Sequence, residues 1–364
     1  MFAPGVALNQ QKIGTTIRPS STALLTIDSE DRFKNYDERD AVLPGGYNYS
    51  PYDFTITKNQ AIMNGFFTRL AVSEVVFPWA IPNINIRTCY IKIFWLDGGG
   101  NPQFFTLTPT SIFTSGGLSG EVMLPVGFYR PAELAARLQI ILRYVTSFGG
   151  FTVEYGYDVG QFVYKANIPA FTFDAGEGNV FALFRANSDN GYPYPNTTRQ
   201  LYDLLGLTTN QVNPDGAQTL YSHPTYCQAI KYVDIVCPQL VYNQSLKDAA
   251  SSTVVQDSLC RLYLANADNS QNMILTATDL SGADTKIFSP PGTVPTTIYR
   301  NFTTPKYISW TPNQPISGQL RFQVYDDQGF ILDPDLLVNP FSAASTNEPS
   351  LPLDWQMTLL VSEN

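Results

Sequence analysis

The stretch Gln319-Leu-Arg-Phe-Gln-Val324 alternates between polar and apolar side chains at every position. Successive side chains of a β-strand point to opposite faces, so this pattern predicts a strand with one buried face and one solvent-facing face. The residues expected to point inward are Leu320, Phe322 and Val324. Those expected to point outward are Gln319, Arg321 and Gln323.

Similar strand patterns occur on both sides of this stretch. They cover residues 23–27, 52–57, 68–77, 89–95, 231–237, 258–264 and 355–361. Pro78 and Pro82 are expected to end the strand over 68–77, because proline removes a donor from the strand ladder. Many strands, 26 prolines and few helices indicate a β-sandwich or a jelly roll.

The middle of the chain has a different pattern. Residues 131–145 carry an apolar stripe at helical spacing, with Pro131 in the first turn. A predicted hairpin over 151–155 and 162–165 follows, and then a short helix over 198–205 that ends at Gly206. Together these elements predict a compact α+β unit inserted into an all-β framework.

The predicted fold is therefore mainly β: a single jelly-roll β-sandwich with an inserted small α+β domain. The strands outside the insertion are close in number to the eight of a single jelly roll. The predicted segments are an extended N-terminal arm at 1–20, a discontinuous jelly-roll domain at 21–102 and 214–364, and an insertion domain at 103–213.

Composition excludes several functional classes. The 364 residues include 15% charged residues and carry a net charge of −9, without a basic run, so we expect no direct nucleic-acid binding. A single histidine, His223, rules out a histidine-rich metal site. A surface with so few charges is typical of a chain covered by partners.

Loops and turns are sufficient to explain the motifs that could otherwise indicate chemistry. His223 lies in a polar connection, and no G-x-S-x-G serine motif accompanies it. The run Asp97-Gly-Gly-Gly100 lacks the Lys-Ser/Thr of a phosphate-binding loop and favours a hairpin turn. We expect no catalytic, cofactor-binding or metal-binding residues and no enzymatic activity. The acidic clusters are consistent with turns, with calcium sites or with an acid/base pair; they are Asp28, Glu30 and Asp31, then Asp326 and Asp327, then Asp333 and Asp335.

The cysteines and the loop tyrosines are the remaining candidates. Cys89, Cys227, Cys237 and Cys260 lie in stretches that favour strands, so we expect buried, reduced thiols; a bridge between Cys227 and Cys237 stays open. Loop tyrosines can stack on sugars, fill a partner's groove, or pack under their own loops. These tyrosines are Tyr47, Tyr49, Tyr52, Tyr192 and Tyr194.

The first residues lack the charged and apolar regions of a signal peptide, and no window is apolar enough to span a bilayer. We therefore expect a soluble product of a reducing compartment, assembled inside the host cell without a signal peptide.

An ordered set of segments carries a family resemblance. The segments are Thr22–Phe33, Gly65–Trp79 with Ile81–Asn85, Pro125–Leu134, Tyr232–Val236 with Gln239–Gln244, Leu320–Gly329 and Leu359–Glu363. In this order they resemble the penton (minor capsid) proteins of virophages and polinton-like viruses, which have more distant relatives in large eukaryotic DNA viruses. The resemblance spans residues 20 to 363.

The resemblance implies a jelly roll whose homopentamers close the five-fold vertices of an icosahedral capsid. Trimers of a double jelly-roll major capsid protein would surround each vertex, and the insertion would face outward, where a host receptor or a glycan is a further partner. The N-terminal arm would suit a tether to a neighbouring capsid protein. No catalytic residues come with the family, and the expected location is the virion.

Two other functions stay open. The loop tyrosines and the insertion are also consistent with a carbohydrate-binding or receptor-binding β-sandwich, that is, an attachment protein. A glycosidase is the third alternative, and it would need two carboxylates within roughly 5 to 10 Å of each other.

Overall fold

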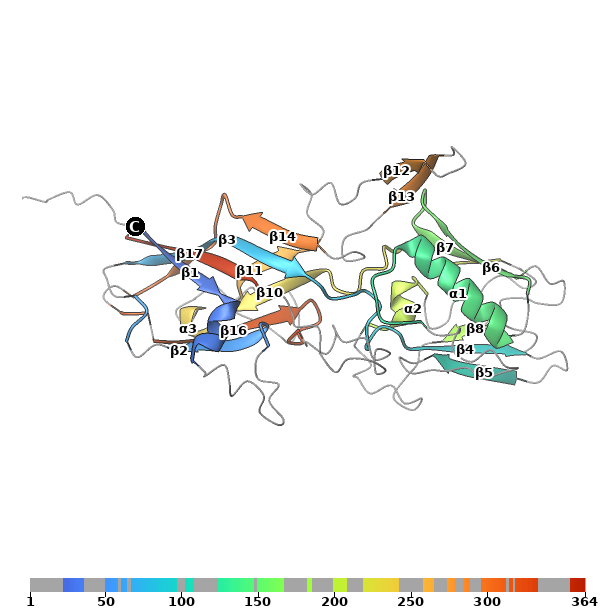
Figure 1. Ribbon diagram of the computed structural model, residues 1–364, viewed down its shortest axis with the longest axis horizontal. Coiled ribbons are helices and arrows are strands. Elements are labelled where there is room, and N and C mark those ends of the chain that lie inside the picture. The colour runs from blue at the N-terminus through green and yellow to red at the C-terminus, as the bar shows by residue number, and fades with distance from the viewer. Residues whose placement is uncertain are drawn as a thin grey trace, which may run out of the picture.

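A computed structural model describes residues 22–35, 50–57, 60–63, 67–96, 102–107, 124–146, 149–166, 182–184, 199–207, 219–241, 258–264, 274–278, 284–288, 296–311, 314–316, 318–332 and 354–363. The predicted arm over 1–20 lies outside these ranges. The chain is mainly β, with several antiparallel sheets and few helices. In Figure 1, two sheets lie at one end of the molecule, and helix α1 with strands β4 to β8 lies at the other.

The first sheet has the strand order β1-β17-β3-β14, and β15 also pairs with β3. All of its pairings are antiparallel. The strand bounds are β1 Thr22–Asp28, β17 Gln356–Ser362, β3 Arg69–Trp79, β14 Thr296–Asn301 and β15 Tyr307–Ser309.

The second sheet has the order β11-β10-β16-β2, again antiparallel throughout. Its strands are β11 Ser258–Tyr263, β10 Tyr232–Val236, β16 Gln319–Asp326 and β2 Asp53–Thr57. The alternation over β16 is confirmed, since Leu320, Phe322 and Val324 are fully buried. Gln323 differs from the prediction: it is only 9% exposed, and its side chain accepts a hydrogen bond from Tyr325 and donates one to Asp53 on the same face.

Aromatic rings fill the space between the two sheets. Phe54 and Phe322 come from the second sheet, and their ring centroids lie 5.6 Å apart. Trp355, which directly precedes β17 of the first sheet, lies 5.7 Å from Phe54 and 6.2 Å from Phe322. Phe77 of β3 lies 6.3 Å from Trp355. The two sheets therefore pack face to face around one aromatic core, which we call the framework.

The predicted end of β3 at Pro78 is wrong. The strand continues to Trp79, and Pro78 pairs with Thr297 of β14. Val76 is the last residue of β3 with a partner in β17. Beyond it the described pairing lies on one side only, which leaves room for a residue without an N–H.

The other end of the molecule forms a second lobe. Helix α1, Pro131–Thr146, buries the predicted stripe, including Leu134, Leu138 and Leu142. It packs against β6, Phe151–Gly156, the first strand of the predicted hairpin, whose second strand is β7, Gln161–Ala166. β7 also pairs with β9, Thr219–Tyr221. A further sheet has the order β5-β4-β8, with bounds Pro102–Leu107, Ile91–Leu96 and Ala182–Phe184.

Strand pairing crosses the predicted domain boundaries. β4 lies within 21–102, which was assigned to the jelly roll, yet it pairs with β5 and β8. β9 lies within 214–364, yet it pairs with β7. The predicted boundaries follow changes in composition, whereas β5 and β7 each have a hydrogen-bonding partner, β4 and β9 respectively, that lies outside residues 103–213. By pairing, the second lobe includes residues 91 to 221.

Short elements complete the described chain. They are the 3-10 helix η1 Ser29–Asn35, the helices α2 Leu201–Leu204 and α3 Pro238–Val241, and a separate hairpin of β12 Ile274–Thr278 and β13 Asp284–Phe288. None of the described helices has the length and apolar character needed to cross a membrane.

Candidate functional site

His223 is exposed in the segment between β9 and β10. Its backbone N–H donates to the Gly206 carbonyl at 2.7 Å, and its own carbonyl accepts from Ser222 Oγ at 2.9 Å. Ser222 Oγ in turn accepts from the Phe162 N–H of β7. The backbone around His223 therefore joins α2 to the β7 strand, as expected for a loop residue with a structural position.

The acidic pair after β16 forms the predicted turn. Asp326 Oδ1 accepts hydrogen bonds from the backbone N–H groups of Gln328 and Phe330, both at 2.9 Å. Gly329 completes the turn with a positive φ of 85°. The pKa of Asp326 is raised above its ordinary value, because burial outweighs the opposite effect of these hydrogen bonds and of Arg87.

This turn also binds two arginines that come from outside the framework strands. Arg87 Nη1 lies 3.5 Å from Asp326 Oδ2, and Arg199 Nη2 lies 3.0 Å from Asp327 Oδ2. Arg199 also donates to the carbonyl of Ala229. Both aspartate side chains are at most 5% exposed, so the loss of one arginine would leave a buried carboxylate without its partner. The acidic pair is therefore an anchor between the framework and the second lobe.

Asn83 joins three separate segments at the same junction. Its Nδ2 donates to the carbonyls of Tyr129 at 2.9 Å and Cys227 at 3.0 Å. Its Oδ1 accepts from the Tyr129 N–H at 2.9 Å, and its own carbonyl accepts from Thr88 Oγ1. The residue is 1% exposed. One carboxamide thus satisfies buried backbone groups from the segment before α1 and from the segment before β10.

Replacing Asn83 by alanine should lower the free energy of unfolding by about 3 kcal/mol, because three backbone groups lose their partner in a buried place. Urea unfolding followed by tryptophan fluorescence measures the loss. Asn301→Ala, at an exposed position of β14, is the control and should change stability by less than about 0.5 kcal/mol. Equal effects of the two substitutions would contradict the role of Asn83 as a junction residue.

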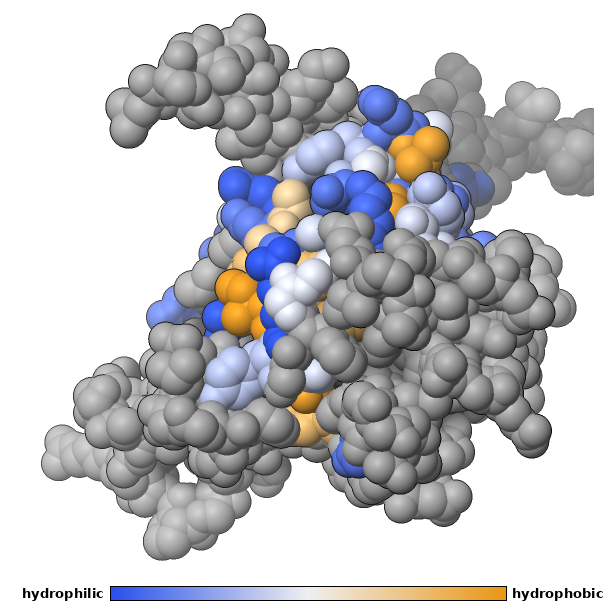
Figure 2. Space-filling view, turned by 90° about the vertical axis from the view of Figure 1, so that its right-hand side faces the viewer, coloured by the Kyte–Doolittle hydropathy of each residue, from blue (hydrophilic) through white to orange (hydrophobic). Residues whose placement is uncertain are grey.

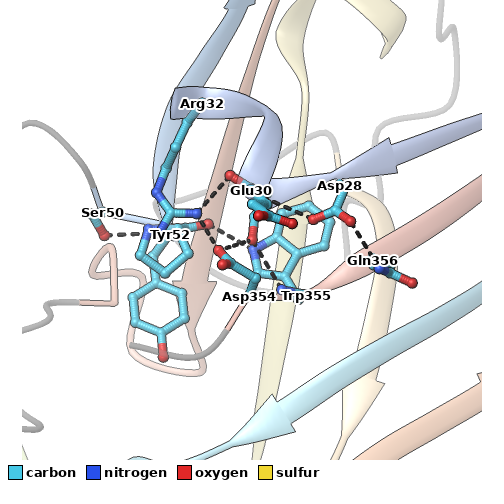
Figure 3. A network of polar contacts seen from close by, with 10 residues as sticks. Asp28, Glu30, Arg32, Ser50, Tyr52, Asp354, Trp355 and Gln356 are labelled. Atoms are coloured by element: carbon cyan, nitrogen blue, oxygen red, sulfur yellow. Dashed lines mark hydrogen bonds and ion pairs between the residues drawn. The ribbon is translucent and has the colours of Figure 1, made fainter. Parts of the chain in front are cut away.

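A polar network holds the two ends of the described framework together (Figure 3). Asp354 accepts from Ser29 Oγ at 2.7 Å and forms an ion pair with the buried Arg32. The Trp355 N–H donates to Ser29 Oγ, and its indole N–H donates to the Pro51 carbonyl at 2.6 Å. This network fixes η1 and the segment before β2 against the start of β17.

The first acidic cluster belongs to the same region. Asp28 Oδ1 accepts from the Glu30 N–H at 2.9 Å, and Oδ2 accepts from Gln356 at 2.8 Å. This favours the turn interpretation for Asp28 and Glu30. Asp333 and Asp335 lie outside the described residues. Among the residues that are described, no group of three or more His, Cys, Asp or Glu side chains is arranged to hold a metal ion.

All four cysteines are buried and free, including Cys227 and Cys237, whose possible bridge the sequence left open. Burial raises the pKa of Cys237 to about 12 and raises those of the other three thiols as well. The prediction that all four lie in strands is wrong. Only Cys260 does, whereas Cys89 and Cys237 flank strands and Cys227 has a positive φ of 56°.

Tyr52 is a core residue, with 1% exposure and a ring 6.2 Å from that of Phe77. It therefore packs inside rather than presenting a ring to a partner. The other loop tyrosines of the sequence prediction, Tyr47, Tyr49, Tyr192 and Tyr194, lie outside the described residues.

Sequence patterns did not point to the exposed apolar residues of the second lobe. Tyr157 and Val159, in the β6–β7 turn, are 43% and 58% exposed. Tyr226 is 60% exposed, and the nearby Tyr155 donates to the Thr225 carbonyl at 2.7 Å. Figure 2 shows the far end of this lobe, where hydrophobic residues occur as separate spots among hydrophilic ones.

The outer face of the second sheet carries charges that pair within the chain. Arg261 makes two hydrogen bonds of 2.8 Å to Asp234, and its guanidinium lies 3.9 Å from the Tyr232 ring centroid. Arg321 makes a similar double contact with Asp53 at 2.9 and 2.7 Å. These paired charges are typical of a face that remains in contact with solvent.

The outer face of the first sheet is different. Strand register places Leu24, Leu360, Ala71 and Tyr307 in one row across β1, β17, β3 and β15. Leu24 is 66% exposed and Tyr307 is 51% exposed, whereas Leu360 is half-buried and the small Ala71 is fully buried between its neighbours. We call these four residues the apolar row.

Comparison with known proteins gives a structural likeness and no match in sequence. No family model matches the chain, and no curated protein sequence matches it. The crystal structure of the mavirus penton protein is similar to it with a TM-score of 0.45 and 11% sequence identity, over 94% of this chain and 98% of that one. At this identity no residue role is carried from that protein to this chain.

Proposed function

We propose that this chain is a structural capsid protein, a penton subunit built on a single jelly roll. In this proposal it forms homopentamers at the icosahedral five-fold vertices of a virion and contacts the double jelly-roll major capsid protein around them. The role requires matched surfaces between subunits and uses no catalytic residue, cofactor or metal.

The nested pairing of the framework strands carries the proposal. Leaving aside β15, the described framework has eight strands, and the first in chain order pairs with the last, the second with the seventh, the third with the sixth, and the fourth with the fifth. These antiparallel pairs are β1 with β17, β2 with β16, β3 with β14, and β10 with β11.

Such nesting arises when one long antiparallel ribbon rolls up, which sends successive pairs alternately into two sheets. The first and third pairs lie in the first sheet, and the second and fourth lie in the second. This order supports a jelly roll, a double-sheet fold of eight strands that is common in viral capsid domains. The second lobe then lies in the connection between the third and fourth framework strands.

Two further observations favour a capsid subunit over other jelly-roll proteins. The space between the sheets is occupied by the rings of Phe54, Phe77, Phe322 and Trp355, as suits a building block more than an enzyme with an internal site. The segments that resemble penton proteins also include most of β1, β3, β10, β16 and β17. The resemblance therefore follows the framework and not one local motif.

The direct test is the mass of the purified chain by native mass spectrometry, together with electron-microscopy class averages. We expect five copies of the 40.4 kDa chain, about 200 kDa, with five-fold symmetry, because a closed ring needs identical heterologous contacts. A chain that is monomeric alone should occupy five-fold vertices in particles. A stable dimer with hydrolase activity would contradict the proposal.

An attachment role is the second candidate. The exposed Tyr157, Val159 and Tyr226 of the second lobe favour it, because aromatic rings at the surface stack on sugars and fill grooves of partners. A glycan array probed with the purified chain distinguishes the two roles. Specific binding by a pentamer would assign both roles to one protein.

A further inference from the structure

The apolar row lies on a part of the first sheet that carries little charge. The outward-facing charged residues of its strands are Arg69, Glu74 and Asp28. Arg69 lies 5.7 Å from the Tyr307 ring, while Glu74 accepts from Thr358 and Tyr299 and Asp28 accepts from Gln356. These three residues give the face a net charge of −1, on a chain whose total is −9.

The exposed apolar surface continues around the edge of the sheet. β1 is the end strand of the first sheet, and its described partner is β17 alone. Residues of its first half are exposed on both faces: Leu24 on the outer face, and Ala23, with the half-buried Leu25, on the inner one. Ile27, further along, is buried. The start of β1 therefore extends past the cover that the second sheet provides.

Edge strands with this composition tend to pair with other chains. Folded proteins protect an edge with lysine, proline, a bulge or a covering segment, and the stretch Ala23-Leu-Leu-Thr-Ile27 contains neither a charged residue nor proline. An end strand of the second sheet is different, because β11 carries Arg261 in its paired contact with Asp234.

We propose that the apolar row and the edge of β1 that has no partner among the described residues form the surface on which a second copy of this chain docks. Two copies, each with a charge of −9, repel one another over most of their surface, so their repulsion is smallest where the face is apolar and carries little charge. The inference rests on the proposed function, since it assigns one half of the contact between neighbouring subunits.

The area of this surface sets the affinity that we expect between two copies. Four strand spacings by seven residues cover roughly 20 by 23 Å, a flat area of about 450 Å². A standard interface buries about 800 Å² per partner. The row must therefore act together with the edge of β1 and neighbouring loops, and the assembly should depend on protein concentration.

Sedimentation velocity of the full chain between about 1 and 200 µM tests the inference, with Leu24→Asp and Tyr307→Asp as variants. Each variant should raise the dissociation constant at least about tenfold, because it buries an uncompensated charge in the apolar contact. Tyr263→Asp is the matched control: Tyr263 is 53% exposed on the second sheet, and its substitution should change the constant by less than about twofold. Thermal unfolding checks that each variant is folded.

Amide hydrogen exchange of the unmodified chain gives a second readout. Residues 22–28 should exchange more slowly at high than at low concentration, because a docked copy covers the edge of β1. A chain that remains monomeric over the whole range, or an assembly that both aspartate variants leave unchanged, would overturn the inference and leave the capsid role standing. A dimer that depends on Leu24 and Tyr307 would support the docking surface and contradict the pentamer.

Discussion

Replacing Gly206 by alanine should destabilise the chain by about 4 kcal/mol or more, which is exceptional for a single methyl group. Gly206 has a φ of +66°, and this conformation alone costs an L-residue roughly 1–2 kcal/mol. A Cβ at this position would lie 2.2 Å from the His223 carbonyl oxygen. That atom belongs to the backbone, so relief requires the 2.7 Å hydrogen bond between the two residues to break.

Calorimetry and urea unfolding of Gly206→Ala measure this effect. Gly149→Ala is the matched control, since a Cβ there has nothing within 4 Å, and its stability should change by less than about 0.5 kcal/mol. A loss below about 1 kcal/mol for Gly206→Ala would contradict the close approach of α2 and the segment after β9.

Replacing Trp355 by alanine should cost about 3–5 kcal/mol, the range for deletion of a large aromatic side chain from a core. Trp355 is fully buried and contacts the rings of Phe54, Phe77 and Phe322. Its indole N–H also donates to the Pro51 carbonyl, which would lose this partner. The substitution therefore affects both the packing between the sheets and the network in Figure 3.

Trp355→Phe separates these two contributions. It retains a ring in the core and removes the indole N–H, so we expect a smaller loss of about 1–2 kcal/mol. The free energy of unfolding from urea titration compares the variants. Equal losses for phenylalanine and alanine would show that the hydrogen bond, and not ring packing, dominates at this position.

Much of the framework was predictable because its signals are local. The alternation over β16 and the stripe of α1 depend only on which neighbouring residues are apolar, and the structure confirms both. Pro78 shows the limit of this reasoning. Whether a proline ends a strand depends on the strands beside it, and β14 and β17 lie more than 200 residues further along the chain.

The junction between the lobes was not predictable for the same reason. Arg199 and Asp327 are 128 residues apart, and nothing near either one indicates its partner. The sequence did indicate a turn at Asp326 and Asp327, but not that two arginines bind it. Asn83 likewise looks like an ordinary polar residue between strands until its three backbone partners are known.

The position of β17 has a consequence for how the chain is made. This strand lies between β1 and β3 in the first sheet, although it is the last described strand to leave the ribosome. β1 and β3 therefore stay apart, without their shared partner, until residues 356–362 have been synthesised. Pairing over such a sequence separation is slow, and incomplete chains expose unpaired strands. A chain cut short before residue 356 lacks the middle of its first sheet, so truncation there should prevent the framework from folding.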